Sequence, residues 1–175
     1  QSTENARGAQ GSRQAPGPGL VTIVAARSAS EMFDELAERF TGCDLLFKTA
    51  AVTDYTPANY CDEKIKKSDD EFVIKLKKTQ DIIKYLGAQK MPNQVICGFS
   101  METENMLENS RKKLVNKNLD MIVANNLKTE GAGFACDTNV VTIITKDEMK
   151  ELPLMSKASV SKDIVDTALS IYNSK

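Results

Sequence analysis

The 175-residue sequence contains no histidine, and this absence excludes several kinds of catalytic site. A Ser-His-Asp triad needs an imidazole as its general base, so that mechanism is impossible here, and the commonest zinc ligand is missing as well. The cysteines do not form the usual zinc or redox motif, because no C-x-x-C pair is present. They are Cys43, Cys61, Cys97 and Cys136. Free thiols in a chain of this size indicate a reducing, cytoplasmic environment.

Long apolar runs and a strong excess of one charge are also missing. No run of about 18 apolar residues occurs, so the sequence predicts no membrane span. The polar N-terminus lacks the apolar centre of a signal peptide. The formal net charge is −1, which gives no reason to expect general nucleic-acid binding. With 41% hydrophobic and 27% charged residues, the chain is expected to form one soluble globular domain.

The two common glycine-rich phosphate-binding motifs are absent. The sequence contains neither G-x-x-x-x-G-K-[ST] nor G-x-G-x-x-G. Gly131 and Gly133 form a lone pair of glycines that fits a turn better than a dinucleotide site. A Rossmann-type oxidoreductase therefore remains an alternative that lacks its fingerprint, and other groups would have to hold any nucleotide.

Residues 1–19 are expected to form a flexible tail or linker. They hold four of the nine glycines and two of the five prolines, with no large aliphatic or aromatic residue. Such a segment cannot bury enough apolar surface to offset its ordering entropy. Residues 20–175 are expected to form the folded domain.

Within the folded part, short apolar strands alternate with amphipathic helices. Strands are predicted at 20–25, 45–52, 94–99, 120–124 and 140–145. Helices are predicted after the N-cap candidates Ser28, Thr79 and Thr103, and over 164–172. This alternation is typical of an α/β protein with a parallel or mostly parallel sheet and helices on both faces.

The stretch 48–67, which begins within the strand predicted at 45–52, holds the groups best placed to bind a ligand. Its apolar strand ends at Thr53 and Asp54, where a carboxyl-end ligand site of an open α/β sheet would lie. A lysine cluster follows at 64–67, and together with 71–78 it is predicted to form a β-hairpin beside the sheet. A carboxylate followed by lysines suits a ligand with hydroxyls and phosphates. The residues alone fit equally well a buried strand, a polar turn and a solvated basic hairpin.

Four sequence runs resemble phosphopantothenoylcysteine synthetase, the ligase half of the bifunctional coenzyme A biosynthesis flavoprotein of bacteria. They are AAVTDY followed by EKIKK, then GFSMET at 98–103, KNLDMIVAN at 117–125 and GFACDTN at 133–139. The resemblance implies a Rossmann-like nucleotide-binding ligase domain over 20–175, which works in the cytoplasm as a homodimer. It also implies an association with a flavin-dependent decarboxylase domain.

The resemblance further implies a set of nucleotide-binding residues. They are Lys48, Thr49, Ala50, Asp54, Lys64, Gln80, Asp81, Ile82, Ile83, Phe99, Lys113 and Lys117. Lys64 would be the catalytic residue that approaches the triphosphate, and Phe99 would pack against the base. Ordinary structural roles stay open for others, since Asp54 can cap a turn and Lys113 and Lys117 can complement a helix dipole.

The implied reaction joins 4′-phosphopantothenate to cysteine and consumes CTP. The carboxylate would attack the α-phosphate of CTP to form an acyl-cytidylate, and the amino group of cysteine would then expel CMP. Mg²⁺ would be held mostly by the phosphates and water, so no metal-binding residue is predicted. CTP rather than ATP follows only from the bacterial character of the motifs.

The family's N-terminal strand, glycine-rich turn and Asn-Ser-Ser-Gly-Lys loop have no counterpart in this sequence. We therefore expect slow turnover from these 175 residues, and a catalytically impaired nucleotide-binding fragment is the alternative. A protein-interaction module is a further alternative, with the hairpin at 64–78 as its dimer surface.

Overall fold

Five strands form the main sheet of the computed structural model, which describes residues 21–59, 61–64, 72–102, 104–126, 129 and 136–175. In spatial order they are β1 (Leu45–Lys48), β4 (Val95–Met101), β5 (Met121–Asn125), β6 (Thr138–Thr145) and β7 (Met149–Ser156). β1, β4 and β5 pair in parallel, whereas β6 is antiparallel to both β5 and β7. Four of the five strands therefore point the same way, which confirms the predicted mostly parallel sheet.

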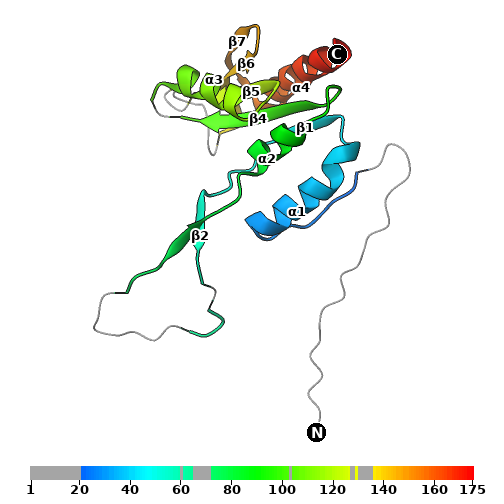
Figure 1. The fold of residues 1–175 in the computed structure, drawn as a ribbon. Helices are drawn as coiled ribbons and strands as arrows, with labels where there is room; N and C mark the ends of the chain where they lie inside the picture. Colours follow the sequence, from blue (N-terminus) through cyan, green and yellow to red (C-terminus); the bar gives the residue numbers. More distant parts are fainter. Residues whose placement is uncertain (1–20, 60, 65–71, 103, 127–128, 130–135) are drawn as a thin grey trace.

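Helices cover both faces of this sheet, as predicted (Figure 1). They are α1 (Ala29–Arg39), α2 (Ile82–Gln89), α3 (Met106–Asn116) and α4 (Lys157–Asn173), and a short 3-10 turn, Phe40–Gly42, follows α1. Val160, Ile164 and Ala168 of α4 pack against one face. Leu86 of α2 and Leu114 of α3 lie in the cluster on the other face, where side chains of α1 also pack. No helix in the described part of the chain is long and apolar enough to cross a membrane.

The buried strands β4 and β5 divide their side chains between these two clusters. Val95 and Cys97 of β4 belong to the α4 side, and the intervening Ile96 belongs to the α2 and α3 side. This alternation follows from the two-residue period of a strand. Burial raises the pKa of the Cys97 thiol to about 12, as expected for an inert core cysteine.

A separate antiparallel pair extends away from the main sheet (Figure 1). It consists of β2 (Tyr55–Pro57) and β3 (Leu76–Lys78). The predicted hairpin therefore exists, but its first arm is wrong, because β3 pairs with Tyr55–Pro57 and not with the lysine cluster. Of that cluster, Lys64 is not in a strand, and 65–67 lie outside the described residues. Backbone bonds from Ala58 to Lys75 and from Thr79 to Asp54 extend the pairing around the β-prone Tyr55-Thr56 pair.

Several predicted boundaries need correction. The run at 21–25 is not a strand, and Val21 and Ile23 are largely exposed, because no described strand lies beside it to share hydrogen bonds. The strand predicted over 45–52 ends at Lys48. β7 was not predicted; it holds Pro153, which is tolerated because β7 lies at the edge of the sheet.

Two of the predicted helix starts also need comment. Ser28 caps α1 as predicted, since its hydroxyl accepts a hydrogen bond from the Glu31 amide. Thr79 is not an N-cap: α2 begins at Ile82, and Asp81 caps it by accepting a hydrogen bond from the Lys84 amide. The predicted cap Thr103 lies outside the described residues, as do residues 1–20, which include the whole predicted tail at 1–19.

Candidate functional site

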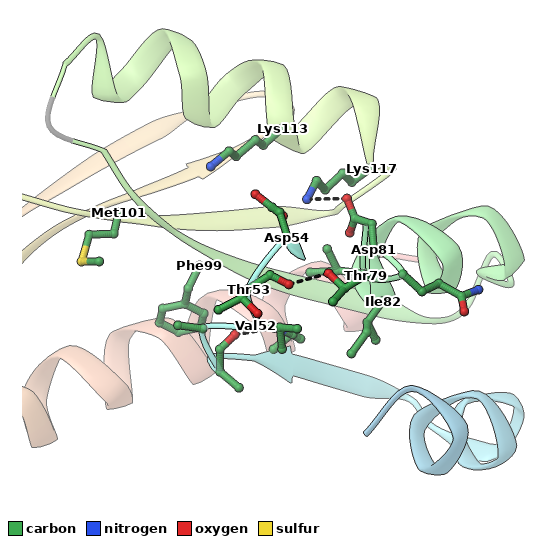
Figure 2. A pocket seen from close by; sticks show the side chains of 15 residues that line it. Val52, Thr53, Asp54, Thr79, Asp81, Ile82, Phe99, Met101, Lys113 and Lys117 are labelled. Atoms are coloured by element: carbon green, nitrogen blue, oxygen red, sulfur yellow. Dashed lines mark hydrogen bonds and ion pairs between the residues drawn. The ribbon is translucent and has the colours of Figure 1, made fainter. Parts of the chain in front are cut away.

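A cleft of about 340 Å³ lies at the carboxyl ends of β1 and β4, between the start of α2 and the second half of α3 (Figure 2). Open α/β sheets bind ligands at this edge. Ten of the twelve predicted nucleotide-binding residues line the cleft. They are Lys48, Ala50, Asp54, Gln80, Asp81, Ile82, Ile83, Phe99, Lys113 and Lys117. The fold thus brings four separate segments together, at 48–54, 80–83, 99 and 113–117, while the part that each residue plays in binding stays a prediction.

The cleft is polar and contains three lysines. Lys113 and Lys117 extend from α3 toward it, as Figure 2 shows, and Lys48 comes from the end of β1. Lys117 forms an ion pair with Asp81, with 2.9 Å between Nζ and Oδ2. Lys113 pairs with Glu102, and the Lys48 ammonium donates to the carbonyl of Ala50.

Asp81 joins α2 to α3 through its two carboxylate oxygens. Oδ1 accepts from the Lys84 amide at 3.1 Å, and Oδ2 pairs with Lys117. Partial burial opposes ionisation of this carboxyl, but the hydrogen bonds from Lys117 and Lys84 outweigh it and hold the pKa of Asp81 below its ordinary value. Asp81 therefore stays charged at neutral pH and keeps Lys117 directed at the cleft.

Gly87 allows α2 to approach the end of α3 closely enough for this pairing. A Cβ atom at Gly87 would lie 1.9 Å from the backbone oxygen of Lys117, so any side chain would force the helices apart. The Gly87 carbonyl also accepts a hydrogen bond from the Asn118 side chain at 2.8 Å. The approach of the two helices is thus part of how the site is built.

The charge balance of the cleft favours an anionic ligand. Burial lowers the pKa of Lys48, and the positive charge of Lys117 lowers it further, although Asp81 acts in the opposite direction. Two ammonium groups therefore repel each other across the cleft. An anion placed between them would relieve that repulsion, as a phosphate group does when bound by lysines.

Thr53 and Thr79 shape the floor of the cleft and were not predicted. The Thr79 hydroxyl donates to the Thr53 carbonyl, and the Thr79 amide donates to the Asp54 carbonyl at 2.9 Å. These bonds tie the loop after β1 to the start of α2. Local sequence patterns do not predict the bond between Thr79 and Thr53, because these residues are 26 positions apart. Ala51, Val52 and Met101 also line the cleft and were not predicted.

Thr49 and Lys64 do not line this cleft. Thr49 follows Lys48 directly and lies on the opposite side of the sheet, where it lines a second cavity beside α4. Lys64 is exposed in the described loop after β2, and its predicted role at the triphosphate stays a prediction. Within the described residues, no group of three His, Cys, Asp or Glu side chains could hold a metal ion.

The fold and the cleft together define an α/β domain with a lysine-rich cleft at the carboxyl edge of its sheet, and the charge of that cleft suits a phosphorylated compound. Comparison with known proteins then identifies its family. The chain belongs to the DNA/pantothenate metabolism flavoprotein C-terminal domain family, whose profile matches residues 8–172. This confirms at the family level the resemblance found in the sequence motifs.

Curated relatives agree with this assignment. The chain is 46% identical over 148 residues to the Coenzyme A biosynthesis bifunctional protein CoaBC of Bacillus subtilis, covering 84% of this chain and 36% of that protein. It is 42% identical over 154 residues to a Cysteine/Cysteine sulfinic acid decarboxylase from an unknown prokaryotic organism, covering 87% of this chain and 43% of that protein. The chain thus spans about two fifths of the length of these relatives.

Solved structures show the same fold. A crystal structure of the C-terminal domain of CoaBC is 34% identical with a TM-score of 0.73, covering 93% of this chain and 71% of that one. A Cab2 mutant in complex with phosphopantothenate-cysteine is 16% identical with a TM-score of 0.65, covering 83% and 51%. At that identity, the second likeness concerns the fold alone.

Proposed function

We propose that this chain ligates 4′-phosphopantothenate to cysteine at the expense of CTP, as the ligase part of a coenzyme A biosynthesis protein. The observation that carries the proposal is the convergence of Lys48, Lys113 and Lys117 in one cleft at the carboxyl ends of β1 and β4. Membership of the family and the names of the CoaBC relatives support the substrate class. The choice of CTP rests on the motif resemblance.

The chemistry proceeds through a mixed anhydride. The carboxylate oxygen of 4′-phosphopantothenate attacks the α-phosphorus of CTP, the bond to the β-phosphate breaks, and pyrophosphate leaves with the electron pair. The amino nitrogen of cysteine then attacks the acyl carbon of the acyl-cytidylate and expels CMP, losing a proton to solvent. Both steps depend on positioning and on stabilisation of negative charge, and neither needs an imidazole.

The lysines of the cleft are held ready for the phosphates by their present partners. Lys117 is paired with Asp81, and Lys113 is paired with Glu102. These carboxylates restrict the lysine rotamers before the nucleotide arrives, so less side-chain entropy is lost on binding. The triphosphate would share or displace them, since it carries more negative charge than one carboxylate. Mg²⁺ would supply further neutralisation and would be bound mainly by phosphate oxygens and water.

A pyrophosphate-release assay tests the proposal directly. The 175-residue chain is incubated with 4′-phosphopantothenate, Mg²⁺ and either CTP or ATP, with and without cysteine. We expect pyrophosphate with CTP in both cases and phosphopantothenoylcysteine only when cysteine is present. CTP binding by calorimetry without any pyrophosphate would instead support the impaired nucleotide-binding fragment. Quenching or enhancement of nicotinamide fluorescence on titration would support the oxidoreductase alternative.

The proposal includes a homodimer formed through the β2–β3 pair. Tyr55, Phe72, Ile74 and Leu76 are more than half exposed there, an unusual concentration of large apolar side chains. Leu76→Ser should shift sedimentation toward the monomer at micromolar concentration. Val115→Ser is the matched control, because Val115 is 73% exposed on α3, outside this pair. Equal sedimentation of both variants and the parent would count against the dimer surface.

The cellular setting is part of the same proposal. The curated relatives are longer than this chain, and one carries the name of a decarboxylase. We therefore place the chain in the bacterial cytoplasm, working together with a flavin-dependent decarboxylase domain. Co-purification of flavin absorbance with the chain from its native source would support this association, and its absence from an active preparation would count against it.

A further inference from the structure

Met101 is a large apolar side chain that lines the lysine-rich cleft and is not part of the core. It is the last residue of β4, and it is 48% exposed. Phe99 and Val52 line the same cleft, but each of them also packs against one of the two core clusters. Among the described residues, Met101 belongs to neither cluster. Core packing therefore does not explain an apolar residue here, whereas contact with a ligand would.

The backbone on both sides of Met101 is fixed to α3. Before it, the buried hydroxyl of Ser100 lies 2.6 Å from the buried hydroxyl of Ser110, and the two share a hydrogen bond. After it, Glu102 forms an ion pair with Lys113. The position of Met101 at the cleft is thus set by its neighbours, while its own side chain remains open to a ligand. A residue held in this way loses little freedom when it binds.

Met101 and Phe99 make one wall of the cleft apolar. Side chains two positions apart on a strand point to the same face, with their Cα atoms about 7 Å apart. Figure 2 shows both residues on one side of the cleft, whereas Lys117 and Asp81 lie on the other. Methionine is flexible and polarizable, so it can adapt to an aromatic ring placed against it.

The cleft therefore has a cationic part and an apolar part. In the cationic part, Lys117 pairs with Asp81 and repels the ammonium of Lys48. A nucleotide also has two unlike halves, an anionic polyphosphate and a flat ring system with apolar faces. If the phosphates bind between Lys48 and Lys117, the base reaches the wall formed by Phe99 and Met101. The distribution of charge thus orients the nucleotide in the cleft.

From this arrangement we infer that Met101 is a nucleotide-binding residue whose side chain covers one face of the base beside Phe99. The inference rests on the proposed function and adds to it a residue that the sequence motifs do not indicate. A thioether has no hydrogen-bond donor and is only a weak acceptor, so the contact depends on the ring face that every base presents. Met101 therefore raises the affinity for CTP and ATP alike, and other groups must select between them.

Calorimetry with CTP, ATP and inorganic tripolyphosphate tests the inference on variants. Met101→Ala should weaken the binding of CTP and of ATP about threefold to tenfold, because part of the apolar area covered by the base is lost. It should leave tripolyphosphate binding unchanged. Met101→Leu keeps an apolar side chain of similar size and should retain most of the affinity. Met149→Ala is the matched control and should change none of the three, since Met149 is 47% exposed on β7, outside the cleft.

Three outcomes would overturn the inference and leave the proposed function standing. The first is an equal loss of tripolyphosphate affinity in Met101→Ala, which would mean that the variant disturbs the lysines and not a contact with the base. The second is a loss of CTP affinity that is as large in Met101→Leu as in Met101→Ala. The third is the same CTP affinity in Met101→Ala and Met149→Ala. Failure of the parent chain to bind CTP would overturn the proposed function together with the inference.

Methionine oxidation tests the contact in the unaltered chain. Mild hydrogen peroxide converts exposed methionines to sulfoxides, and mass spectrometry of peptides follows each methionine separately. Saturating CTP should slow the oxidation of Met101, whereas tripolyphosphate should not. Met149 should be oxidised at the same rate with either ligand and with none. Oxidation of Met101 at one rate with and without bound CTP would overturn the inference.

Discussion

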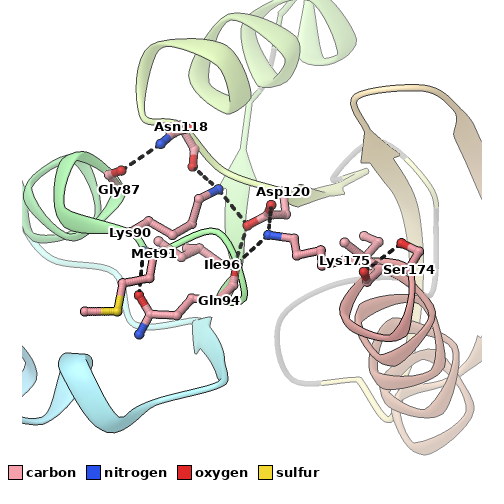
Figure 3. Close-up of polar contacts among 10 residues, drawn as sticks. Gly87, Lys90, Met91, Gln94, Ile96, Asn118, Asp120, Ser174 and Lys175 are labelled. Atoms are coloured by element: carbon pink, nitrogen blue, oxygen red, sulfur yellow. Dashed lines mark hydrogen bonds and ion pairs between the residues drawn. The ribbon is translucent and has the colours of Figure 1, made fainter.

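Asp120 is a buried carboxylate at the amino-terminal edge of the sheet, and its removal should strongly destabilise the fold. Lys90 and Lys175 each approach it to 2.8 Å, and the Ile96 amide donates to it at 2.8 Å (Figure 3). The side chains of Asp120 and Lys90 are 5% and 7% exposed. This cluster joins the end of α2, the start of β4, the start of β5 and the end of α4.

The charge state of Asp120 determines when this cluster contributes. Burial opposes ionisation, but hydrogen bonds from Lys175 and Lys90 outweigh it, and the pKa of Asp120 lies below its ordinary value of 3.8. A depressed pKa in the folded state means that the stabilisation is fully present above pH 3.8. It is lost as the pH falls through the folded-state pKa. At neutral pH the whole contribution is available to be measured.

For Asp120→Ala, we expect a loss of about 3–5 kcal/mol in the free energy of unfolding, the range for breaking a buried ion pair by removing one partner. Lys175 can turn toward solvent, but Lys90 is left buried without its counter-ion. For a chain of this length, the melting temperature should fall by about 6–20 °C. Urea unfolding and thermal melts followed by circular dichroism measure both quantities.

Asp166→Ala is the matched control for this prediction. Asp166 also pairs with a lysine, but its side chain is 57% exposed, so its removal should cost less than about 1 kcal/mol. CTP affinity, measured below both melting transitions, should be the same in the two variants, because Asp120 does not line the lysine-rich cleft that we propose binds CTP. A loss for Asp120→Ala no larger than for Asp166→Ala would refute the reasoning from burial.

Three further predictions concern the lysine-rich cleft and Lys64. Lys117→Gln should weaken CTP binding about tenfold but CMP binding much less, because charge-assisted bonds to the outer phosphates are lost. Lys112→Gln is the control and should change neither affinity, since Lys112 is exposed on the same helix. Equal losses of CTP and CMP affinity in calorimetry would indicate an effect on α3 instead. Lys64→Ala should abolish pyrophosphate release without changing the melting temperature, and unchanged release would remove Lys64 from the mechanism. Asp81→Asn should lower the urea midpoint at pH 7, and the difference in midpoint from the parent should close as the pH falls below 3.8, because an Asp81 carboxyl with a depressed pKa contributes its full stabilisation only above that pH. A difference in midpoint that is constant with pH would mean that the charge of Asp81 is not involved.

Much of the fold could be predicted because its signals are local. Apolar runs of strand length marked β4, β5 and β6, and a capping box marked the start of α1. The carboxyl-edge cleft could also be anticipated, since parallel strands bring their ends together and Asp54 lies in the loop that follows β1. These inferences need only a periodicity of a few residues.

Other features depend on partners that local patterns do not specify. The run at 21–25 has strand-like residues but no described neighbour to pair with, and β7 is a strand despite Pro153 because it pairs with β6 only on one side. The first arm of the hairpin was predicted wrongly, because β3 pairs with Tyr55–Pro57 and not with the lysine cluster.

The sequence alone determined the α/β alternation, the family motifs and most of the residues that line the cleft. Only the tertiary structure decided that Thr79 closes the loop after β1, that Asp81 pairs with Lys117, and that Thr49 serves the opposite side of the sheet. The physical reason is that each of these depends on a contact or a facing direction set by the packing of α2 and α3 on the sheet. Such packing is decided by the whole core at once, whereas helix and strand signals are carried by neighbouring residues.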